Sequence, residues 1–393
     1  MADSAKVSVV VPVYNTAAYL RECLDSLVGQ TLYDIEIVCV DDGSTDESPS
    51  ILEEYAARDG RVRVLRQKNQ GAGAARNNGL LQARGAYVMF CDSDDFMARD
   101  ALELLWTQCE QDAADVCVCA GERFYESLEL TVAAPGYLEV NRLPEEMPFN
   151  RHSNAEHLFS FTTIMMFNKM FRRQFLLDHG LRYGTTRNGE DVEICAFALW
   201  YAERITVVRK PLVTYRIDRP DSLVGTLSAS ATDPLRAWMR VWDAIGGELG
   251  AARRSFDCKF LGVIRHGFRN VTTAEAFAAC CNYVRDEVLQ KIDFRPREEG
   301  YYYTPWYNVF VEHLTRDSLE NFMAYMVYAA SRELEAEEAR KLDERRKLKE
   351  ERRDVARLSK ENKELARKFS KVEGIYRAGA AVRRVLRKAK RGA

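Results

Sequence analysis

The chain has 393 residues, of which 47% are hydrophobic and 30% charged, and its formal net charge is −2. This length favours two or three folded units, and the composition excludes a disordered or fibrous protein. No apolar stretch reaches the roughly 20 residues that a membrane-spanning helix needs, and the acidic body of the chain argues against a nucleic-acid partner.

Charge is unevenly distributed along the chain. Residues 332–393 contain 22 Lys and Arg and 12 Asp and Glu, a net charge of +10, which leaves −12 for the rest. A basic tail on an acidic body predicts an anionic surface as the partner of the tail.

The ten cysteines indicate a reducing compartment. Most lie inside apolar runs, where a reduced thiol packs as a small hydrophobic group, and their spacing fits neither a zinc site nor a disulfide framework. The chain runs from Met1 into its first apolar run without a signal peptide. We therefore expect a cytoplasmic protein.

The first 120 residues alternate between expected strands and helices. β-branched apolar runs predict the strands, and apolar positions on one face predict the helices. This alternation predicts a parallel, doubly wound α/β sheet. The expected strands are 7–13, 35–40, 62–65, 87–91 and 116–119, and the expected helices are 17–28, one beginning near Pro49, and 101–111.

A glycine-rich segment at residues 69–79 opens a further expected helix. It completes neither the dinucleotide fingerprint nor a phosphate-binding P-loop. It does offer a helix amino terminus with Arg76 one turn inside, and both features suit a phosphate group.

An apolar strand, residues 87–91, ends in the acidic sequence Asp-Ser-Asp-Asp at 92–95. Ligands bind at the carboxyl ends of strands in open α/β sheets. Asp92 and Asp94 can converge on one hard divalent cation, which would also relieve their mutual repulsion.

Beyond Gly121 the pattern loosens. Residues 123–140 suggest a hairpin around Pro135-Gly136, and residues 168–176 suggest a helix with a basic face that stops near Gly180. An apolar helix is expected at 192–202 and a strand at 207–215.

We divide the chain into residues 1–225, 226–330 and 331–393. The second part is mostly helical and rich in aromatic residues, which at helical spacing are usually core. The third can be written as heptads, so it is either a coiled coil that pairs subunits or a solvated single helix. Its last stretch, 375–393, either lies on an anionic membrane or is a frayed tail.

Three acidic clusters, at 41–42, 92–95 and 190–191, carry the candidate chemistry. The first has a turn explanation, because Asp-Gly-Ser is common in turns. The third has a helix-capping explanation beside a catalytic one.

Taken in order, the motifs resemble those of family 2 glycosyltransferases. The resemblance covers residues 7 to about 222 and is absent beyond about 225. Its motifs are Val-Ser-Val-Val-Val-Pro-Val-Tyr-Asn at 7–15, Asp-Asp-Gly-Ser-Thr-Asp at 41–46, Gly-x4-Arg-Asn-x-Gly-Leu at 71–80, Asp-Ser-Asp-Asp at 92–95 and Gly-Glu-Asp at 189–191.

The resemblance implies a GT-A fold and inverting transfer of a sugar from a nucleotide sugar. Asp191 would be the catalytic base, Glu190 would orient the acceptor or the base, and Asp94 with Asp92 would bind Mn²⁺ or Mg²⁺. The remaining nucleotide-sugar contacts would come from Pro12, Tyr14, Asn15, Asp41, Asp42, Arg76, Ser93, Arg216, Arg219 and Ser222.

The expected activity is transfer from a UDP-sugar to a glycan or lipid-linked glycan in bacterial surface glycan synthesis, of capsule, O-antigen or teichoic acid type. One alternative is a GDP- or dTDP-sugar donor. Another is an inactive nucleotide-binding scaffold in which the coiled coil carries the function.

Overall fold

The computed structural model describes residues 5–217 and 230–332, together with a few isolated positions further along. By its contacts the chain divides into a compact unit, Met1–Met323, and a second unit, Ala324–Ala393. The boundary expected at 225, the candidate residues Arg219 and Ser222, the coiled coil and the basic tail lie outside the described residues.

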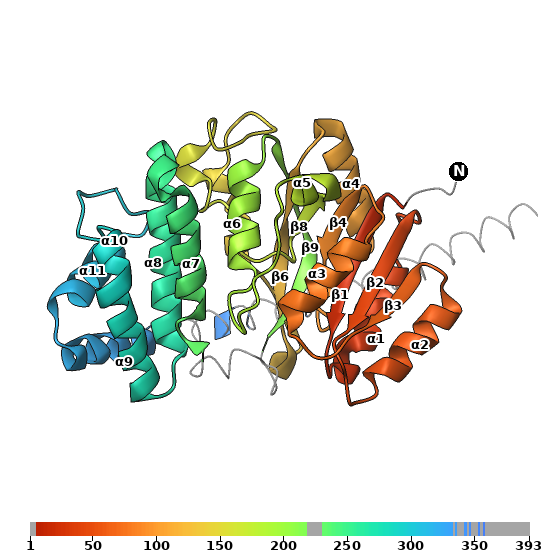
Figure 1. Ribbon diagram of the computed structural model, residues 1–393, viewed down its shortest axis with the longest axis horizontal. Coiled ribbons are helices and arrows are strands. Elements are labelled where there is room, and N and C mark those ends of the chain that lie inside the picture. Colours follow the sequence, from red (N-terminus) through yellow and green to blue (C-terminus); the bar gives the residue numbers. More distant parts are fainter. Residues whose placement is uncertain are drawn as a thin grey trace, which may run out of the picture. The chain divides into compact units, whose positions relative to one another are not determined.

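A mixed nine-stranded sheet forms the centre of the first unit within the described residues (Figure 1). Its order is β3-β2-β1-β4-β8-β6-β9-β5, with β7 paired to β6. The strands are β1 (Val7–Val13), β2 (Ile35–Asp41), β3 (Val62–Arg66), β4 (Tyr87–Phe90), β5 (Phe96–Met97), β6 (Val116–Tyr125), β7 (Leu130–Ala133), β8 (Lys169–Arg172) and β9 (Ile205–Ile217).

The first four strands run parallel, as the alternation predicted. Every residue of β1 and β2 is buried, which is typical of strands covered on both faces. Gly79 allows helix α3 (Ala72–Gln82) to approach β1, because a Cβ atom there would lie 2.3 Å from Val10. The other helices of this half are α1 (Ala17–Val28), α2 (Ser48–Arg58) and α4 (Ala101–Asp112).

Two predictions for the middle of the chain are wrong. The hairpin exists, but β6 and β7 turn at residues 126–129 and not at Pro135, which begins a short 3₁₀ helix. The segment predicted as one helix over 168–176 is strand β8 followed by a short helix α5 (Arg173–Asp178). β8 pairs antiparallel with both β4 and β6, and these distant partners override the local helical preference.

Lys169, which belonged to the segment predicted as a helix with a basic face, is fully buried. Its Nζ donates to the carbonyl oxygens of Thr163 (2.8 Å) and Met165 (2.7 Å) and to side-chain oxygens of Thr162 (3.3 Å) and Asn168 (2.8 Å). Burial lowers the pKa of Lys169. The ammonium group therefore pins the loop before β8 to the sheet.

The later part of the described chain is helical, as predicted, and Figure 1 shows α6, α7 and α8 side by side. Phe159 joins this region to the sheet-bearing part, since its ring packs against Trp238 (6.2 Å) and Phe256 (5.9 Å). These aromatic side chains are core, as expected. The helices are α6 (Val192–Tyr201), α7 (Asp233–Ile245), α8 (Arg253–Asn270), α9 (Ala274–Tyr283), α10 (Leu289–Lys291) and α11 (Trp306–Arg316).

The prediction that the cysteines pack as buried thiols is confirmed, because all ten are buried and free. In the described part of the chain, every helix is too short or too polar to cross a bilayer.

We expect Lys169→Met to lower the free energy of unfolding by about 3 kcal/mol, because methionine leaves buried carbonyl oxygens without a donor. Urea unfolding followed by tryptophan fluorescence measures this change. The matched control is Lys291→Met, which removes an exposed pair with Asp243 and should cost far less than the change at Lys169. Equal losses in the two variants would contradict the structural role of Lys169.

Candidate functional site

The first candidate residues gather at one edge of the sheet. β1, β2 and β4 are parallel and in register, so their carboxyl ends lie together. The segments that follow these strands begin with Tyr14, Asp42 and Cys91. This edge is where open α/β sheets bind ligands.

The turns after β1 and β2 are bonded to each other. Asn15 has a left-handed backbone (φ 52°), and its side-chain oxygen accepts from the Thr45 N–H at 2.7 Å. The Asn15 N–H in turn donates to the Ser44 hydroxyl at 3.2 Å. Tyr14 is exposed beside this contact, whereas Pro12 is buried within β1.

Asp41 and Asp42 are buried and accept hydrogen bonds from the surrounding loops. Asp41 accepts from the Ser44 N–H at 2.9 Å. Asp42 accepts from the backbone N–H groups of Gln70 (2.9 Å) and Gly71 (2.8 Å) and from the Gln67 side chain. The turn explanation therefore holds for Asp41, whereas Asp42 bonds to the loop over 67–71.

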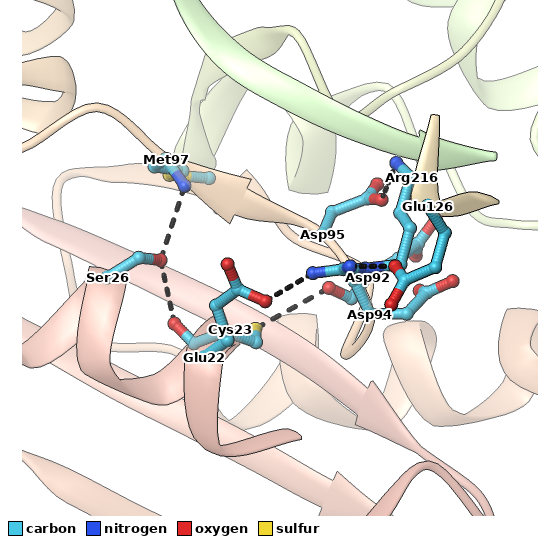
Figure 2. Close-up of polar contacts among 9 residues, drawn as sticks. All are labelled: Glu22, Cys23, Ser26, Asp92, Asp94, Asp95, Met97, Glu126 and Arg216. Atoms are coloured by element: carbon cyan, nitrogen blue, oxygen red, sulfur yellow. Dashed lines mark hydrogen bonds and ion pairs between the residues drawn. The ribbon is translucent and has the colours of Figure 1, made fainter. Parts of the chain in front are cut away.

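Residues 92–95, which we call the acidic turn, have partners of another kind from those of Asp41 and Asp42 (Figure 2). Asp95 is buried, with one oxygen accepting from the Arg216 N–H at 2.9 Å and the other buried without a partner among the described residues. Burial and the neighbouring Asp94 and Asp92 raise the pKa of Asp95 well above its usual range. Ser93 accepts a hydrogen bond from the Thr16 hydroxyl at 2.9 Å.

Arg76 connects two of the three acidic clusters. Its guanidinium group donates to Asp92 at 2.5 Å and to Glu190 at 2.8 Å. Arg76 is only 9% exposed, and its guanidinium lies 5.1 Å from the Tyr183 ring centre. The sequence associated Arg76 with phosphate, and these two carboxylate partners were not predicted.

Asp191 stands at the amino end of α6 next to this bridge. It occupies the capping position, but its side chain makes no capping hydrogen bond. Burial and the adjacent Glu190 raise the pKa of Asp191 to about 7, against the lowering effect of Arg76. Its carboxyl group can therefore exchange a proton near neutral pH.

The absence of a side chain at Gly73 lets the loop that carries Glu190 pack directly against α3. A Cβ atom on Gly73 would lie 2.3 Å from the Gly184 carbonyl oxygen and 3.2 Å from the Glu190 side chain. The Gly184 N–H also donates to the Glu190 carbonyl at 2.7 Å. The glycine-rich segment therefore has a packing function that its sequence did not reveal.

Arg216, predicted as a nucleotide-sugar contact, is engaged within the chain. It is 4% exposed at the end of β9, and its guanidinium group is paired with Glu22 and Glu126. Neither glutamate belongs to a recognisable motif, so sequence reasoning missed both.

The acidic turn fits a divalent cation in part. Asp92 and Asp94 offer hard oxygen atoms, yet residues 5–217 and 230–332 contain no group of three or more His, Cys, Asp or Glu arranged around a metal. Mg²⁺ commonly binds to one or two carboxylates and completes its shell with substrate phosphates and water. The donor set present is therefore compatible with a cation that arrives with a diphosphate.

The arrangement of strands, acidic turn and following helices is that of a GT-A domain. Residues 8–180, less than half of the chain, match the model of glycosyl transferase family 2, and this segment carries the similarity to that family. The chain is 36% identical over 223 residues to the uncharacterized glycosyltransferase EpsJ of Bacillus subtilis, covering 55% of this chain and 62% of EpsJ. The chain thus spans less than two thirds of this curated relative.

Two solved structures share the fold at low sequence identity. S. aureus TarS 1–349, in complex with UDP-GlcNAc, has a TM-score of 0.55 and 19% identity, over 81% of this chain and 89% of TarS 1–349. The mannosyltransferase PcManGT of Pyrobaculum calidifontis, with GDP-Man and Mn²⁺, has a TM-score of 0.50 and 17% identity, over 84% and 87% of the two chains. The predicted fold is confirmed.

We expect Gly73→Ala to displace the loop over 184–191, because the added methyl group overlaps the Gly184 carbonyl. Hydrogen exchange should show at least a tenfold loss of protection in amides of this loop, with β1 unchanged. Gly60→Ala is the matched control, since a Cβ atom there meets nothing within 4 Å. Undisturbed exchange in Gly73→Ala would contradict the tight approach.

Proposed function

We propose that this chain is a metal-dependent, inverting glycosyltransferase that moves a sugar from a UDP-sugar to an acceptor hydroxyl. The observation that supports this best is the half-buried carboxyl group of Asp191, whose neighbour Glu190 is joined through Arg76 to Asp92. A base for the acceptor and a site for the donor would then share one set of ion pairs.

Asp191 would act as the general base. A carboxylate with a pKa near 7 is strong enough to take the acceptor proton and is still ionised in much of the protein at neutral pH. The acceptor oxygen would attack the anomeric carbon from the side opposite the leaving diphosphate, which inverts the configuration. Glu190, held by Arg76, would keep the Asp191 loop in place.

The turns after β1 and β2 would hold the nucleoside. Tyr14 is exposed and can stack on a base, while Asp41 and Asp42 present carboxylate oxygens that can accept from a uracil N–H. UDP-GlcNAc in the TarS complex supports a uridine donor. Arg76, with the amino end of α3, would face the diphosphate.

Asp94 and Asp92 would hold Mn²⁺ or Mg²⁺, which when bound neutralises the charge that develops on the departing nucleoside diphosphate. To reach the cation, Asp92 must share or leave its contact with Arg76. The freed guanidinium group could then bind phosphate oxygens, which agrees with the role expected from the sequence.

The acceptor proposed is a glycan or lipid-linked glycan of a bacterial surface polymer. Helix α7 packs against α6, and Arg240 pairs with Glu193 at 2.7 Å, only two residues after Asp191. The helical region is thus close enough to the base to help present an acceptor. The similarity to EpsJ, an uncharacterized glycosyltransferase of a bacterium, supports a bacterial setting.

A GDP-sugar donor is the second candidate, because PcManGT binds GDP-Man on the same fold. A catalytically inactive scaffold is less well supported. Such a scaffold would have no need for a half-buried carboxyl group with a raised pKa beside an ion-paired arginine.

Asp191→Asn should reduce sugar transfer by 10²- to 10⁴-fold, because the amide cannot accept the acceptor proton. UDP release in the presence of acceptor measures transfer, and calorimetry should show UDP affinity within about threefold of the parent protein. Asp178→Asn, an exposed change on α5, is the control. Full activity in Asp191→Asn would mean that the base lies elsewhere.

The pH dependence follows from the same carboxyl group. Its pKa is raised to about 7, and only the deprotonated form is a base. We therefore expect kcat/KM for the acceptor to fall about tenfold per pH unit below about 7 and to level off above it. UDP binding over the same range separates this effect from donor binding. An acid limb near pH 4, the range of an ordinary aspartate, would contradict it.

A further inference from the structure

Arg216 holds the acidic turn from the β9 side by two hydrogen bonds. Its backbone N–H donates to the Asp95 carboxylate at 2.9 Å, and its Nε donates to the Asp94 carbonyl oxygen at 3.0 Å. Both bonds are buried and link residues about 120 positions apart in the sequence. Figure 2 shows the side chain reaching along the turn from the end of its strand.

The terminal nitrogens of Arg216 pair with two glutamates outside the acidic turn. Nη1 pairs with Glu126, which follows β6, and Nη2 pairs with Glu22 of α1. Two anions therefore surround one cation, so the pair of glutamates more than balances the guanidinium charge. Without them, a buried positive charge beside Asp94 would oppose the binding of a divalent cation.

Aromatic rings fix the same guanidinium group in its position. Its central carbon lies 5.1 Å from the ring centre of Tyr19, 5.6 Å from that of Phe96 and 5.0 Å from that of Phe124. A planar guanidinium group can contact aromatic rings while its several N–H groups donate hydrogen bonds in fixed directions. A lysine ammonium group does not reproduce this arrangement of donors.

Helix α1 holds the opposite side of the turn. The Cys23 thiol lies 3.5 Å from the Asp92 carbonyl oxygen, and the Ser26 hydroxyl accepts from the Met97 N–H at 3.2 Å. Because Glu22 also belongs to α1, the ion pair with Arg216 closes a ring of contacts that runs from α1 through the turn to β9.

We propose that Arg216 is a positioning residue for the acidic turn. It orients the backbone that carries Asp92 and Asp94, while Glu22 and Glu126 neutralise it so that the turn keeps its attraction for a divalent cation. This inference rests on the proposed metal-dependent binding of a nucleoside diphosphate. It differs from direct phosphate contact, because the guanidinium group is already engaged within the chain.

The test is the calorimetric affinity for UDP, measured with and without MnCl₂. In the parent protein Mn²⁺ should strengthen UDP binding. Arg216→Lys keeps the charge but loses the Nε bond. The ratio of UDP affinity with Mn²⁺ to that without it should therefore be about tenfold smaller than in the parent protein, which is the effect of one lost hydrogen bond. Affinity for UDP without metal should stay within twofold.

Arg61→Lys is the matched control. Arg61 also donates to a carboxylate, that of Asp59, and to a carbonyl oxygen, that of Val28, but it lies away from the acidic turn. Its replacement should leave the effect of Mn²⁺ unchanged. Thermal unfolding of both variants shows whether each is folded.

A second variant tests the neutralisation and does not depend on replacing a buried arginine. The double change Glu22→Gln and Glu126→Gln alters two partly exposed side chains and leaves Arg216 uncompensated. The strengthening by Mn²⁺ should fall about threefold, and more at low salt than at high salt. An unchanged or larger effect of Mn²⁺ would overturn this part.

Each remaining outcome is decisive. If Arg216→Lys keeps the full effect of Mn²⁺, Arg216 does not position the turn. If the variant weakens UDP equally with and without metal, Arg216 contacts the diphosphate directly and the inference is wrong. If the parent protein binds UDP without any effect of Mn²⁺, the proposed metal dependence itself fails.

Discussion

The ion pairs of Arg76 are the interaction on which the candidate site depends. Three acidic clusters from distant parts of the sequence come to one edge of a sheet, where their charges repel one another. Arg76 lies between two of them and contacts Asp92 and Glu190 together. Burial of Arg76 carries a desolvation cost that its two carboxylate partners offset, whereas removal of either partner would leave a buried charge uncompensated. The loop that carries Asp191 is thereby tied to the strand that carries the acidic turn.

Local sequence explains the first hundred residues well. β-branched runs such as residues 7–13 and a one-sided apolar pattern such as residues 17–28 fix an element without reference to distant partners. The acidic turn was recognised because three acids directly follow a buried strand. Its assignment to a nucleotide-sugar site came from resemblance, since spacing alone identifies only a cation site.

Elements that depend on distant partners could not be predicted from the local sequence. β8 contains Lys169 and Arg172 and resembles an amphipathic helix, yet pairing with β4 and β6 makes it a strand. The partners of Arg76 and Arg216 lie up to 194 positions away along the chain. No periodicity encodes such contacts, so residues like Glu22 and Glu126 emerge only when the sheet is assembled.

The reactivity of the buried thiols reports whether the surrounding structure is folded. All ten cysteines are enclosed, and burial raises the pKa of Cys195 to about 11 and that of Cys39 to about 12. Thiolate is the reactive form, so alkylation requires the surrounding structure to open first. Since Cys23 and Cys91 flank the acidic turn whereas Cys280 lies in α9, the order in which they are modified reports which region opens first.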